Sequence, residues 1–404
     1  MTKLILHPAI WTGRYTRYVL AGYLRNVAMV VSVLMIIALT IDLWPQIDLI
    51  TSSTTNSNWR GSWNLVRFSG LRLPGLVAPL LPFATFLGVA WAEITHTQAG
   101  ERMFVWNTGR SPIQCLPAAI LLGLILGPLE FTLDAYLGPA AMAIQMGERL
   151  GLDGQRLDRT RTNDVHWIAT SSALLKAEIA YGPPPILHNL TVFKLDDQNR
   201  LYEIDRARTA RQIANSKNWL LEDGSFWVPP QQSTDTNASP SALLSEDPGH
   251  HKMLPFAARQ VTLDIPPLWL TVLGVEPQYL PISVLRALEP YDQAPLSRGL
   301  YRTRIQVLYG ETLLPGAMAV LAASLAILLL PYGVEPMPVF GIIMSGYLAH
   351  AGTKACLLMG QNGYIPAGIA GWLVPVALLG ATYAAFRILG YRVGRPLTAS
   401  PAEP

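Results

Sequence analysis

Long apolar runs alternate with short polar stretches over most of the chain, and one long polar segment interrupts them. Six runs reach the ~20 residues that a helix needs to cross the ~30 Å hydrocarbon core of a bilayer. These runs cover residues 24–43, 73–94, 115–138, 313–332, 337–359 and 365–389. The pattern predicts an α-helical membrane protein with six transmembrane helices, three on each side of the polar segment.

The polar segment, residues 148–304, has the pattern of β structure. Residues 261–265 alternate between apolar and polar side chains, and residues 190–195 form a strand-like run that ends in the turn-forming cluster 196–199. Further short runs follow at a spacing of roughly ten residues, which is typical of a sandwich or jelly roll. We therefore predict an inserted all-β, jelly-roll-like domain and its connector over 148–304. Residues 1–147 would hold helices one to three, and residues 305–404 would hold helices four to six and a cytoplasmic tail.

Charge is concentrated in the same segment. It holds 35 charged residues in 157, or 22%, whereas the other 247 residues hold 22, or 9%. A soluble protein carries about 25% charged residues, so only the segment 148–304 has the composition of a soluble domain. The formal net charge is +3 and no basic stripe stands out, which argues against a nucleic-acid partner.

Short-loop Lys and Arg residues predict the orientation, because cytoplasmic loops carry an excess of them. With the N-terminus inside, the cytoplasmic parts hold nine such residues and the short outer loops hold three. The nine are Lys3, Arg14, Arg17, Arg25, Arg102, Arg110, Arg387, Arg392 and Arg395, and the three are Arg60, Arg67 and Arg72. Both termini are therefore predicted to be cytoplasmic, and the segment 148–304 is predicted to be periplasmic.

The loop between the second and third apolar runs, about 95–110, carries an unusual apolar cluster. Glu101 suits the first turn of a short helix, where the helix dipole favours an anion, and Gly109 suits the position just after the helix. Met103, Phe104 and Trp106 would be large apolar groups on a short loop, which is typical of an interface. Composition alone leaves two possibilities open, a contact with a partner protein and a helix lying in the lipid headgroups.

A set of basic residues is predicted to lie at the outer membrane level. Arginine suits bidentate contacts with phosphate, and a charge inside a span is costly enough to suggest a function. A single side chain could equally extend towards the outer headgroups. The candidates for binding a lipid phosphate are Arg60, Arg67, Arg72, Arg302, Arg304 and Lys354.

The remaining polar residues give no catalytic pattern. The chain has no Gly-x-x-x-x-Gly-Lys-Ser/Thr phosphate loop and no Gly-x-Ser-x-Gly elbow. The seven histidines form no pattern of metal ligands, and Glu130 and Asp134 lie four apart on one helix face. We expect a protein that is not an enzyme and that holds no metal and no cofactor of its own.

Three spans, an outer β domain and three more spans resemble the LptF/LptG permease family, the paired membrane subunits of the lipopolysaccharide exporter. Residues 99–112 (AGERMFVWNTGRSP) look like the family's cytoplasmic segment, in which an acidic residue opens a short helix that a glycine ends. Residues 189–204 (NLTVFKLDDQNRLYEI) look like its β-domain pattern, and residues 364–375 (YIPAGIAGWLVP) resemble its entry into span six. The end of span one, residues 39–45 (LTIDLWP), favours LptG.

The resemblance implies an exporter that extracts lipopolysaccharide from the outer leaflet of the bacterial inner membrane. A paralogous six-span permease would complete a heterodimer, ATP and Mg would be bound by a cytoplasmic ABC ATPase dimer, and a periplasmic jelly-roll protein would receive the lipid. Spans one and five would form the lateral gate. The alternative is a membrane-anchored periplasmic binding or scaffold protein without transport activity. The resemblance makes 95–110 a coupling helix that contacts the ATPase through Glu101, Arg102, Met103, Phe104, Trp106 and Gly109.

Overall fold

The structure is a computed structural model in which most of the chain is described. The described residues are 11–52, 58–155, 165–170, 173–180, 185–196, 198, 200–213, 217–227, 253–263, 265–273, 275–290, 298–331 and 333–393, without the side chains of 52, 58–61, 267, 298 and 388–393. The chain forms two compact units. A helical unit comprises Met1–Leu152, Pro277–Ala287 and Gly299–Pro404, and a β unit comprises Asp153–Glu276 and Leu288–Arg298.

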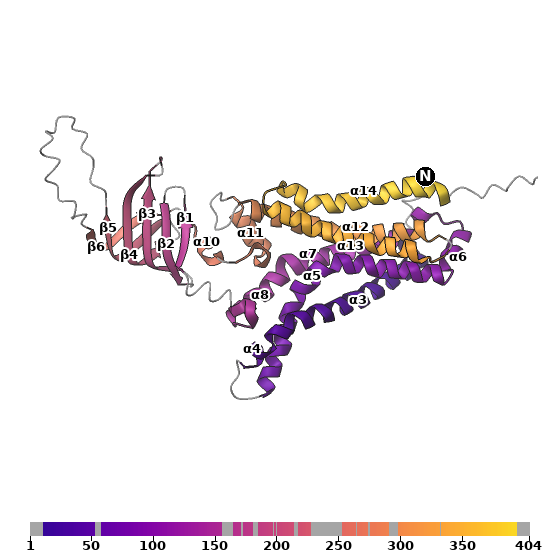
Figure 1. Cartoon of the computed structure of the whole chain (residues 1–404), viewed down its shortest axis with the longest axis horizontal. Helices are drawn as coiled ribbons and strands as arrows, with labels where there is room; N and C mark the ends of the chain where they lie inside the picture. The colour runs from indigo at the N-terminus through magenta and orange to yellow at the C-terminus, as the bar shows by residue number, and fades with distance from the viewer. Residues whose placement is uncertain are drawn as a thin grey trace, which may run out of the picture. The chain divides into compact units, whose positions relative to one another are not determined.

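The first half of the helical unit consists of long helices joined by short turns (Figure 1). Three proline residues lie inside its longest helix, α5, which a membrane helix tolerates because neighbouring groups satisfy the freed backbone carbonyls. The elements are α3 (Arg14–Leu43), η1 (Trp44–Gln46), α4 (Ile47–Ser52), α5 (Asn58–Gln98), α6 (Glu101–Asn107), η2 (Pro112–Cys115), α7 (Pro117–Thr132), the π-helical turn η3 (Leu133–Leu137) and α8 (Gly138–Gly147).

The second half of the helical unit follows the β insertion. Its elements are η4 (Pro277–Tyr279), α11 (Ile282–Leu288), α12 (Arg298–Leu329), α13 (Pro336–Gln361) and α14 (Ala367–Val393). Helix α12 is the most buried, and the outer faces of α3, α13 and α14 expose large apolar side chains. Exposed apolar faces of this size suit contact with lipid or with a partner helix.

Five helical stretches of the described residues are long and apolar enough to cross a membrane. They are Arg14–Thr51, Ser62–Gln98, Pro112–Gly147, Gly299–Leu329 and Ala367–Arg387. Helix α13 has 26 residues, which is long enough, but glycines, His350 and Lys354 lower its hydropathy. The prediction of a largely helical membrane protein is confirmed, and its sixth span stays a prediction.

Pairs of small residues bring the helices of the bundle into close contact. A Cβ added at Gly123 of α7 would lie 2.3 Å from the Cα of Gly316 in α12, and one at Gly310 of α12 would lie 2.0 Å from the carbonyl oxygen of Gly371 in α14. Contacts this short require residues without a side chain, as in other membrane bundles. Gly346 of α13 likewise packs on the ring of Phe86 in α5. At Gly346, helix α13 therefore packs against another helix of the same chain.

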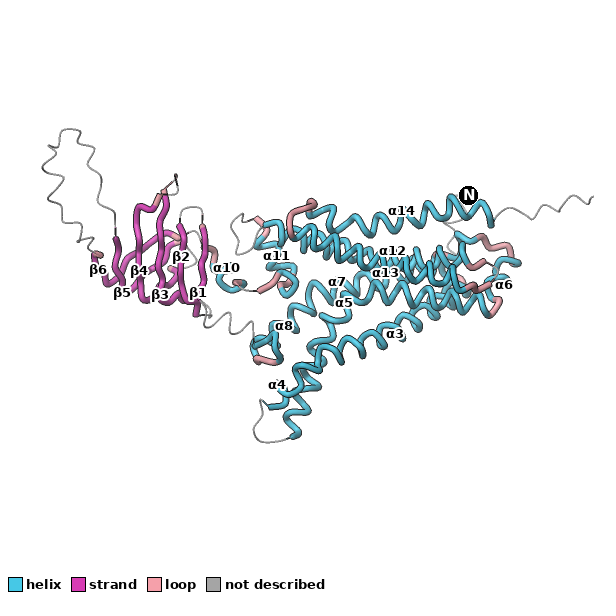
Figure 2. The backbone as a smooth tube through the Cα atoms, viewed as in Figure 1, coloured by secondary structure: helices cyan, strands magenta, loops and turns pink. Residues whose placement is uncertain are grey.

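The described residues of the β unit form an antiparallel sheet of six strands, drawn in magenta in Figure 2. The strands pair in sequence order, so the sheet is an up-and-down meander, whereas a jelly roll is built from Greek keys. An inserted all-β domain was predicted, and it is confirmed. The strands are β1 (Val165–Ala169), β2 (Ala173–Ala180), β3 (Ile186–Leu195), β4 (Leu201–Gln212), β5 (Asn218–Trp227) and β6 (Leu254–Thr262), followed by the short helix α10 (Pro267–Val272).

The turn between β3 and β4 lies where the sequence predicts one. The carboxylate of Asp196 accepts hydrogen bonds from the backbone N–H groups of Arg200 and Gln198, at 2.8 and 2.9 Å. The bond from the Arg200 N–H, with smaller contributions from the Arg200 side chain and from Gln198, holds the pKa of Asp196 below its usual value. These bonds favour the ionised form and keep β3 and β4 in register.

Candidate functional site

Helix α6 lies between two glycines with left-handed backbone conformations. Gly100, with φ +72°, precedes the helix, and Gly109, with φ +85°, follows it by two residues. Glycine is the residue that adopts these angles without strain, so the two turns fix where the helix begins and ends. The short helix that an acidic residue opens and Gly109 ends was predicted from the sequence, and it is confirmed.

The side chain of Arg102 attaches α6 to the bundle. One guanidinium nitrogen donates hydrogen bonds to the carbonyl oxygens of Ala326 and Leu330, at 2.6 and 3.1 Å, near the end of α12. The other forms an ion pair with the carboxylate of Glu93 in α5, and the hydroxyl of Tyr23 in α3 donates to the same carboxylate. Arg102 and Glu93 are both buried. This network joins α3, α5, α6 and α12 at one point.

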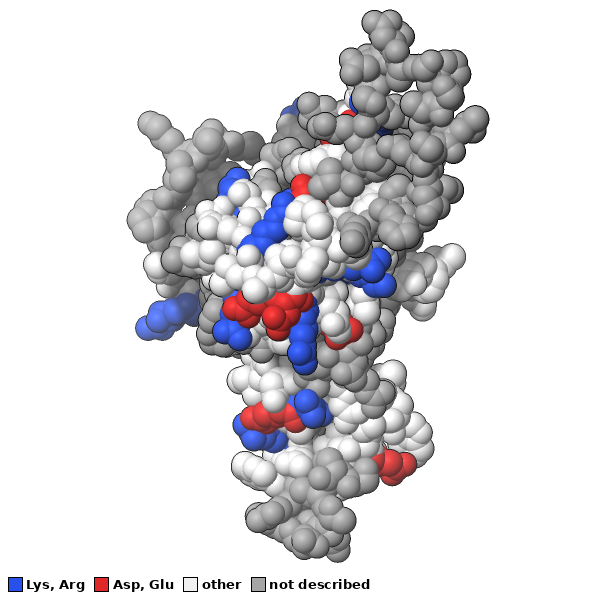
Figure 3. All heavy atoms as spheres, turned by 90° about the vertical axis from the view of Figure 1, so that its left-hand side faces the viewer, with Lys and Arg blue, Asp and Glu red and all other residues white. Residues whose placement is uncertain are grey.

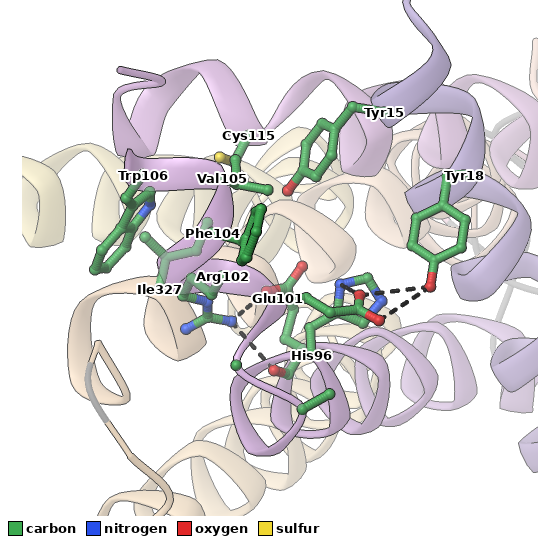
Figure 4. Close-up of a pocket in the computed structure, with 13 residues that line it drawn as sticks. Tyr15, Tyr18, His96, Glu101, Arg102, Phe104, Val105, Trp106, Cys115 and Ile327 are labelled. Carbon is green, nitrogen blue, oxygen red and sulfur yellow. Dashed lines mark hydrogen bonds and ion pairs between the residues drawn. The ribbon is translucent and has the colours of Figure 1, made fainter. Parts of the chain in front are cut away.

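The neighbouring Glu101 faces a different environment. Tyr18 donates a hydrogen bond to its carboxylate at 3.2 Å, and Nδ1 of His96 lies 3.6 Å from it. The side chain of Glu101 is 42% exposed. Figure 4 shows Tyr18, His96 and Glu101 on one side of a cavity and Arg102 on the other. Two consecutive charged residues therefore have opposite roles, one facing solvent and one buried.

Large apolar side chains of α6 point away from the bundle. Phe104 is 79% exposed and Met103 is 42% exposed, whereas Trp106 packs against the hydrophobic core. The cavity beside them, drawn in Figure 4, has a volume of about 320 Å³ and is lined by Glu101, Phe104 and residues of α3 and α5. An exposed apolar pair next to a hollow is typical of a protein-binding surface.

Acidic and basic side chains form ion pairs at the opposite end of the helical unit. Arg72 of α5 makes a bidentate pair with Asp42 of α3, at 2.8 and 3.0 Å. Arg304 of α12 pairs with Asp134 of the π-helical turn at 2.7 Å. On the one face of the molecule that Figure 3 draws, acidic side chains likewise border basic ones. The attraction within each pair offsets part of the cost of removing both charges from water.

These pairs surround a second cavity, of about 230 Å³. Its lining includes Arg72, Asp134, Arg304 and Glu311 together with Lys354 of α13. Lys354 is half-buried, and no carboxylate of the described residues lies within ion-pair distance of it. The cavity thus combines two arginines that are paired with carboxylates and one lysine that has no ion-pair partner among the described residues.

Comparison with known families identifies the chain. The sequence profile described as "Lipopolysaccharide export system permease LptF/LptG" matches residues 17–388. The chain belongs to the LptF/LptG permease family. No curated protein sequence matches it. The family profile covers LptF and LptG together, so the two are not distinguished here. Members are transport permeases and not enzymes, and the helices of this chain suit a membrane protein.

The predicted basic residues of this LptF/LptG permease fall into two groups. Arg72, Arg304 and Lys354 line the second cavity together. Arg67 is not part of that lining and forms an exposed ion pair with Glu148 at 2.5 Å. Arg302 is exposed and is also not part of the lining, and the side chain of Arg60 lies outside the described residues.

The acidic partners Glu93, of Arg102, and Glu311, of Arg304, were not predicted from the sequence. Glu93 is a lone carboxylate in an apolar run, which requires a partner, and Arg102 is nine residues away along the chain. Glu311 lies seven residues after Arg304, two turns along the same helix face, and its carboxylate is 3.9 Å from the guanidinium. Both signals are visible in the sequence, but the pairings depend on how the helices pack.

Proposed function

We propose that this permease extracts lipopolysaccharide from the outer leaflet of the bacterial inner membrane as one half of a two-permease exporter. The chain has no phosphate loop, so a separate pair of ABC ATPases would hydrolyse ATP with its Mg. The observation that carries the proposal is helix α6, whose Phe104 and Met103 face outward while Arg102 holds the helix on the bundle. Arg102 would keep α6 from sliding over the helices beneath it. A movement of the bound partner would therefore be transmitted to the helical bundle.

We infer the orientation in the membrane from the end of the helical unit that carries α6. The start of α3, helix α6 and the end of α14 lie together in Figure 1. Short-loop basic residues favour a cytoplasmic location for this end, with both termini inside. The chain leaves the helical unit at the opposite end, after Leu152, and the β unit would then fold in the periplasm.

The second cavity supports a role in lipid binding. Lys354 would contact a lipid phosphate, and Arg72 and Arg304 would do so if the phosphate displaced Asp42 or Asp134. The exposed apolar faces of α3 and α13 would meet acyl chains or the paired permease, with spans one and five as the lateral gate. Among the described strands, β1 and β6 pair on one side only, and such edges can add a strand of a periplasmic jelly-roll partner.

The test reverses the charge of Glu101. In Glu101→Arg we expect the permease to insert and to pair normally, but ATPase co-purification and lipopolysaccharide export to fall at least about tenfold, since loss of a buried interfacial charge costs roughly 2–5 kcal/mol. Glu335, an exposed carboxylate immediately before α13, provides the matched control, Glu335→Arg. Normal export from Glu101→Arg would contradict the proposal. So would a chain that never co-purifies with an ATPase, as a scaffold protein would behave.

A further inference from the structure

A straight row of side chains crosses the sheet of the β unit. Trp167 on β1 lies opposite Lys176 on β2, Lys176 lies opposite Thr191 on β3, Thr191 lies opposite Arg206 on β4, and Arg206 lies opposite Ser225 on β5. Residues directly opposite one another in neighbouring strands point to the same face. The row therefore presents an aromatic ring, two cations and two hydroxyls along one line.

The row lies in a shallow depression of about 550 Å³. Arg208, Asn189 and Asp223 also line it, so that three cations face one carboxylate. Neighbouring strands lie about 4.8 Å apart, which puts the backbones of Lys176 and Arg206 about 10 Å from each other with Thr191 between them. Two long side chains at that separation can reach a ligand above the threonine from both sides.

The cations of this row differ from those of the opposite face of the sheet. There Lys194 and Arg259 form ion pairs with Glu203 and Asp205, at distances from 2.6 to 3.3 Å, and Asp205 is fully buried. For Lys176, Arg206 and Arg208, no carboxylate of the described part of the chain lies within ion-pair distance. The fold thus neutralises the charges of one face and leaves those of the other available.

Lys176 is held in place although it has no carboxylate partner. Its ammonium lies 5.6 Å from the centre of the Trp167 ring, a cation–π distance. Trp167 in turn stacks on Phe193, with ring centres 6.1 Å apart and planes inclined by 14°. The aromatic pair reduces the freedom of the lysine, so less conformational entropy is lost when a ligand binds.

We propose that this row, Trp167–Lys176–Thr191–Arg206–Ser225, is a binding site for the phosphate groups of a phosphorylated saccharide. The guanidinium of Arg206 supplies a bidentate donor for phosphate, and the ammonium of Lys176 supplies a second positive charge. The hydroxyl of Thr191 adds a neutral donor between them. The hydroxyl of Ser225 lies beside Arg206 and would exchange its weak hydrogen bond to the sulfur of Met253, at 3.4 Å, for one to phosphate. The site would hold the sugar-phosphate part of the exported lipid outside the sheet. That choice of saccharide rests on the proposed function.

The experiment measures binding to the full-length permease in uncharged detergent by calorimetry. One probe is the water-soluble, deacylated sugar-phosphate portion of lipopolysaccharide, and the other is inorganic pyrophosphate. Arg206→Gln and Lys176→Gln should each weaken binding by about tenfold, the usual effect of losing a charge-assisted hydrogen bond. Arg211→Gln is the matched control, because Arg211 is an exposed arginine on the same strand that already faces Glu222 at 3.9 Å.

The two probes separate the possible sources of the phosphate. Tighter binding of the deacylated lipid portion assigns the site to the lipid headgroup, and equal or tighter binding of pyrophosphate assigns it to a soluble phosphate. The proposal is overturned if neither probe binds, or if Arg211→Gln weakens binding as much as Arg206→Gln does. Circular dichroism of each variant checks that the sheet has folded. ATPase co-purification through Glu101 is a separate measurement, so the exporter proposal can fail independently of this one.

Discussion

The side chains of Glu93 and Arg102 explain how a carboxylate is accommodated in the apolar α5. Both residues are buried, and their ion pair is completed by Tyr23 and by two carbonyl oxygens of α12. The carbonyl of Ala326 already accepts the backbone N–H of Leu330 at 3.0 Å, so Arg102 adds a second donor there and supplies a donor to the carbonyl of Leu330, at the end of the helix. Arg102 therefore adds donors at one helix end and fixes another helix to it. We assign it a positioning role, in place of the direct ATPase contact that the resemblance implied.

Removing Arg102 should separate stability from partner contact. In Arg102→Ala we expect a loss of about 3–5 kcal/mol in the free energy of unfolding, because Glu93 is left buried without its cation. Denaturant unfolding in detergent measures this loss. The double variant Glu93→Gln with Arg102→Ala should recover part of it, since the uncompensated charge is gone. Arg25→Ala, an exposed arginine of α3, is the control and should change stability little. A neutral Arg102→Ala would show that the network does not hold α6.

At the scale of elements, glycines decide how closely the helices approach. Gly123 and Gly316 meet between α7 and α12, and Gly310 and Gly371 meet between α12 and α14. Because lipid offers no hydrophobic drive for helix association, such close packing supplies much of the stability of a bundle. Helix α12 therefore lies at the centre of the bundle, held on two sides by glycine contacts.

A methyl group at one of these contacts should loosen the bundle. Gly123→Ala would place a Cβ 2.3 Å from the backbone of α12, so α7 and α12 must separate, at a cost of about 1–3 kcal/mol. Thermal unfolding of the purified permease measures the change. Gly341→Ala on α13 is the matched control, because no atom lies within 4 Å of its added Cβ. Equal stability of the two variants would contradict a tight α7–α12 contact.

At the scale of the whole helical unit, three long helices and the π-helical turn supply the charged side chains that line the second cavity. Arg72 comes from α5, Asp134 from the π-helical turn, Arg304 from α12 and Lys354 from α13. The π-helical turn matters here because it shifts the side chains that follow it relative to a regular α-helix. No single helix carries this site, so it exists only when the bundle has packed.

The charge of Lys354 should matter more than that of Arg67 for lipid binding. We expect Lys354→Glu to reduce photocrosslinking of lipopolysaccharide to the cavity by about tenfold, because it replaces an available cation with an anion. Arg67→Glu, the control, removes an exposed cation that already pairs with Glu148 and should have a small effect. Equal crosslinking in the wild type and in Lys354→Glu would exclude this lysine as a lipid contact.

The sequence by itself determined the class of protein, the inserted β domain and the short helix α6. Apolar run length, strand alternation and the positions of Glu101 and Gly109 are local properties, and the chain follows them because bilayer thickness and backbone geometry leave few alternatives. The family motifs are also contiguous in the sequence, and the family match over residues 17–388 agrees with them.

Only the tertiary structure decided which basic side chains are paired with a carboxylate and which are not. From the sequence Arg72 and Arg304 are equivalent to Lys354, but packing brings a carboxylate to each arginine and brings none of the described ones to the lysine. The order of the six strands likewise depends on which neighbours pair, and the row from Trp167 to Ser225 exists only through that pairing. Ion pairing and strand register act between residues far apart in the chain, and a periodic pattern along the sequence carries no information about such distances.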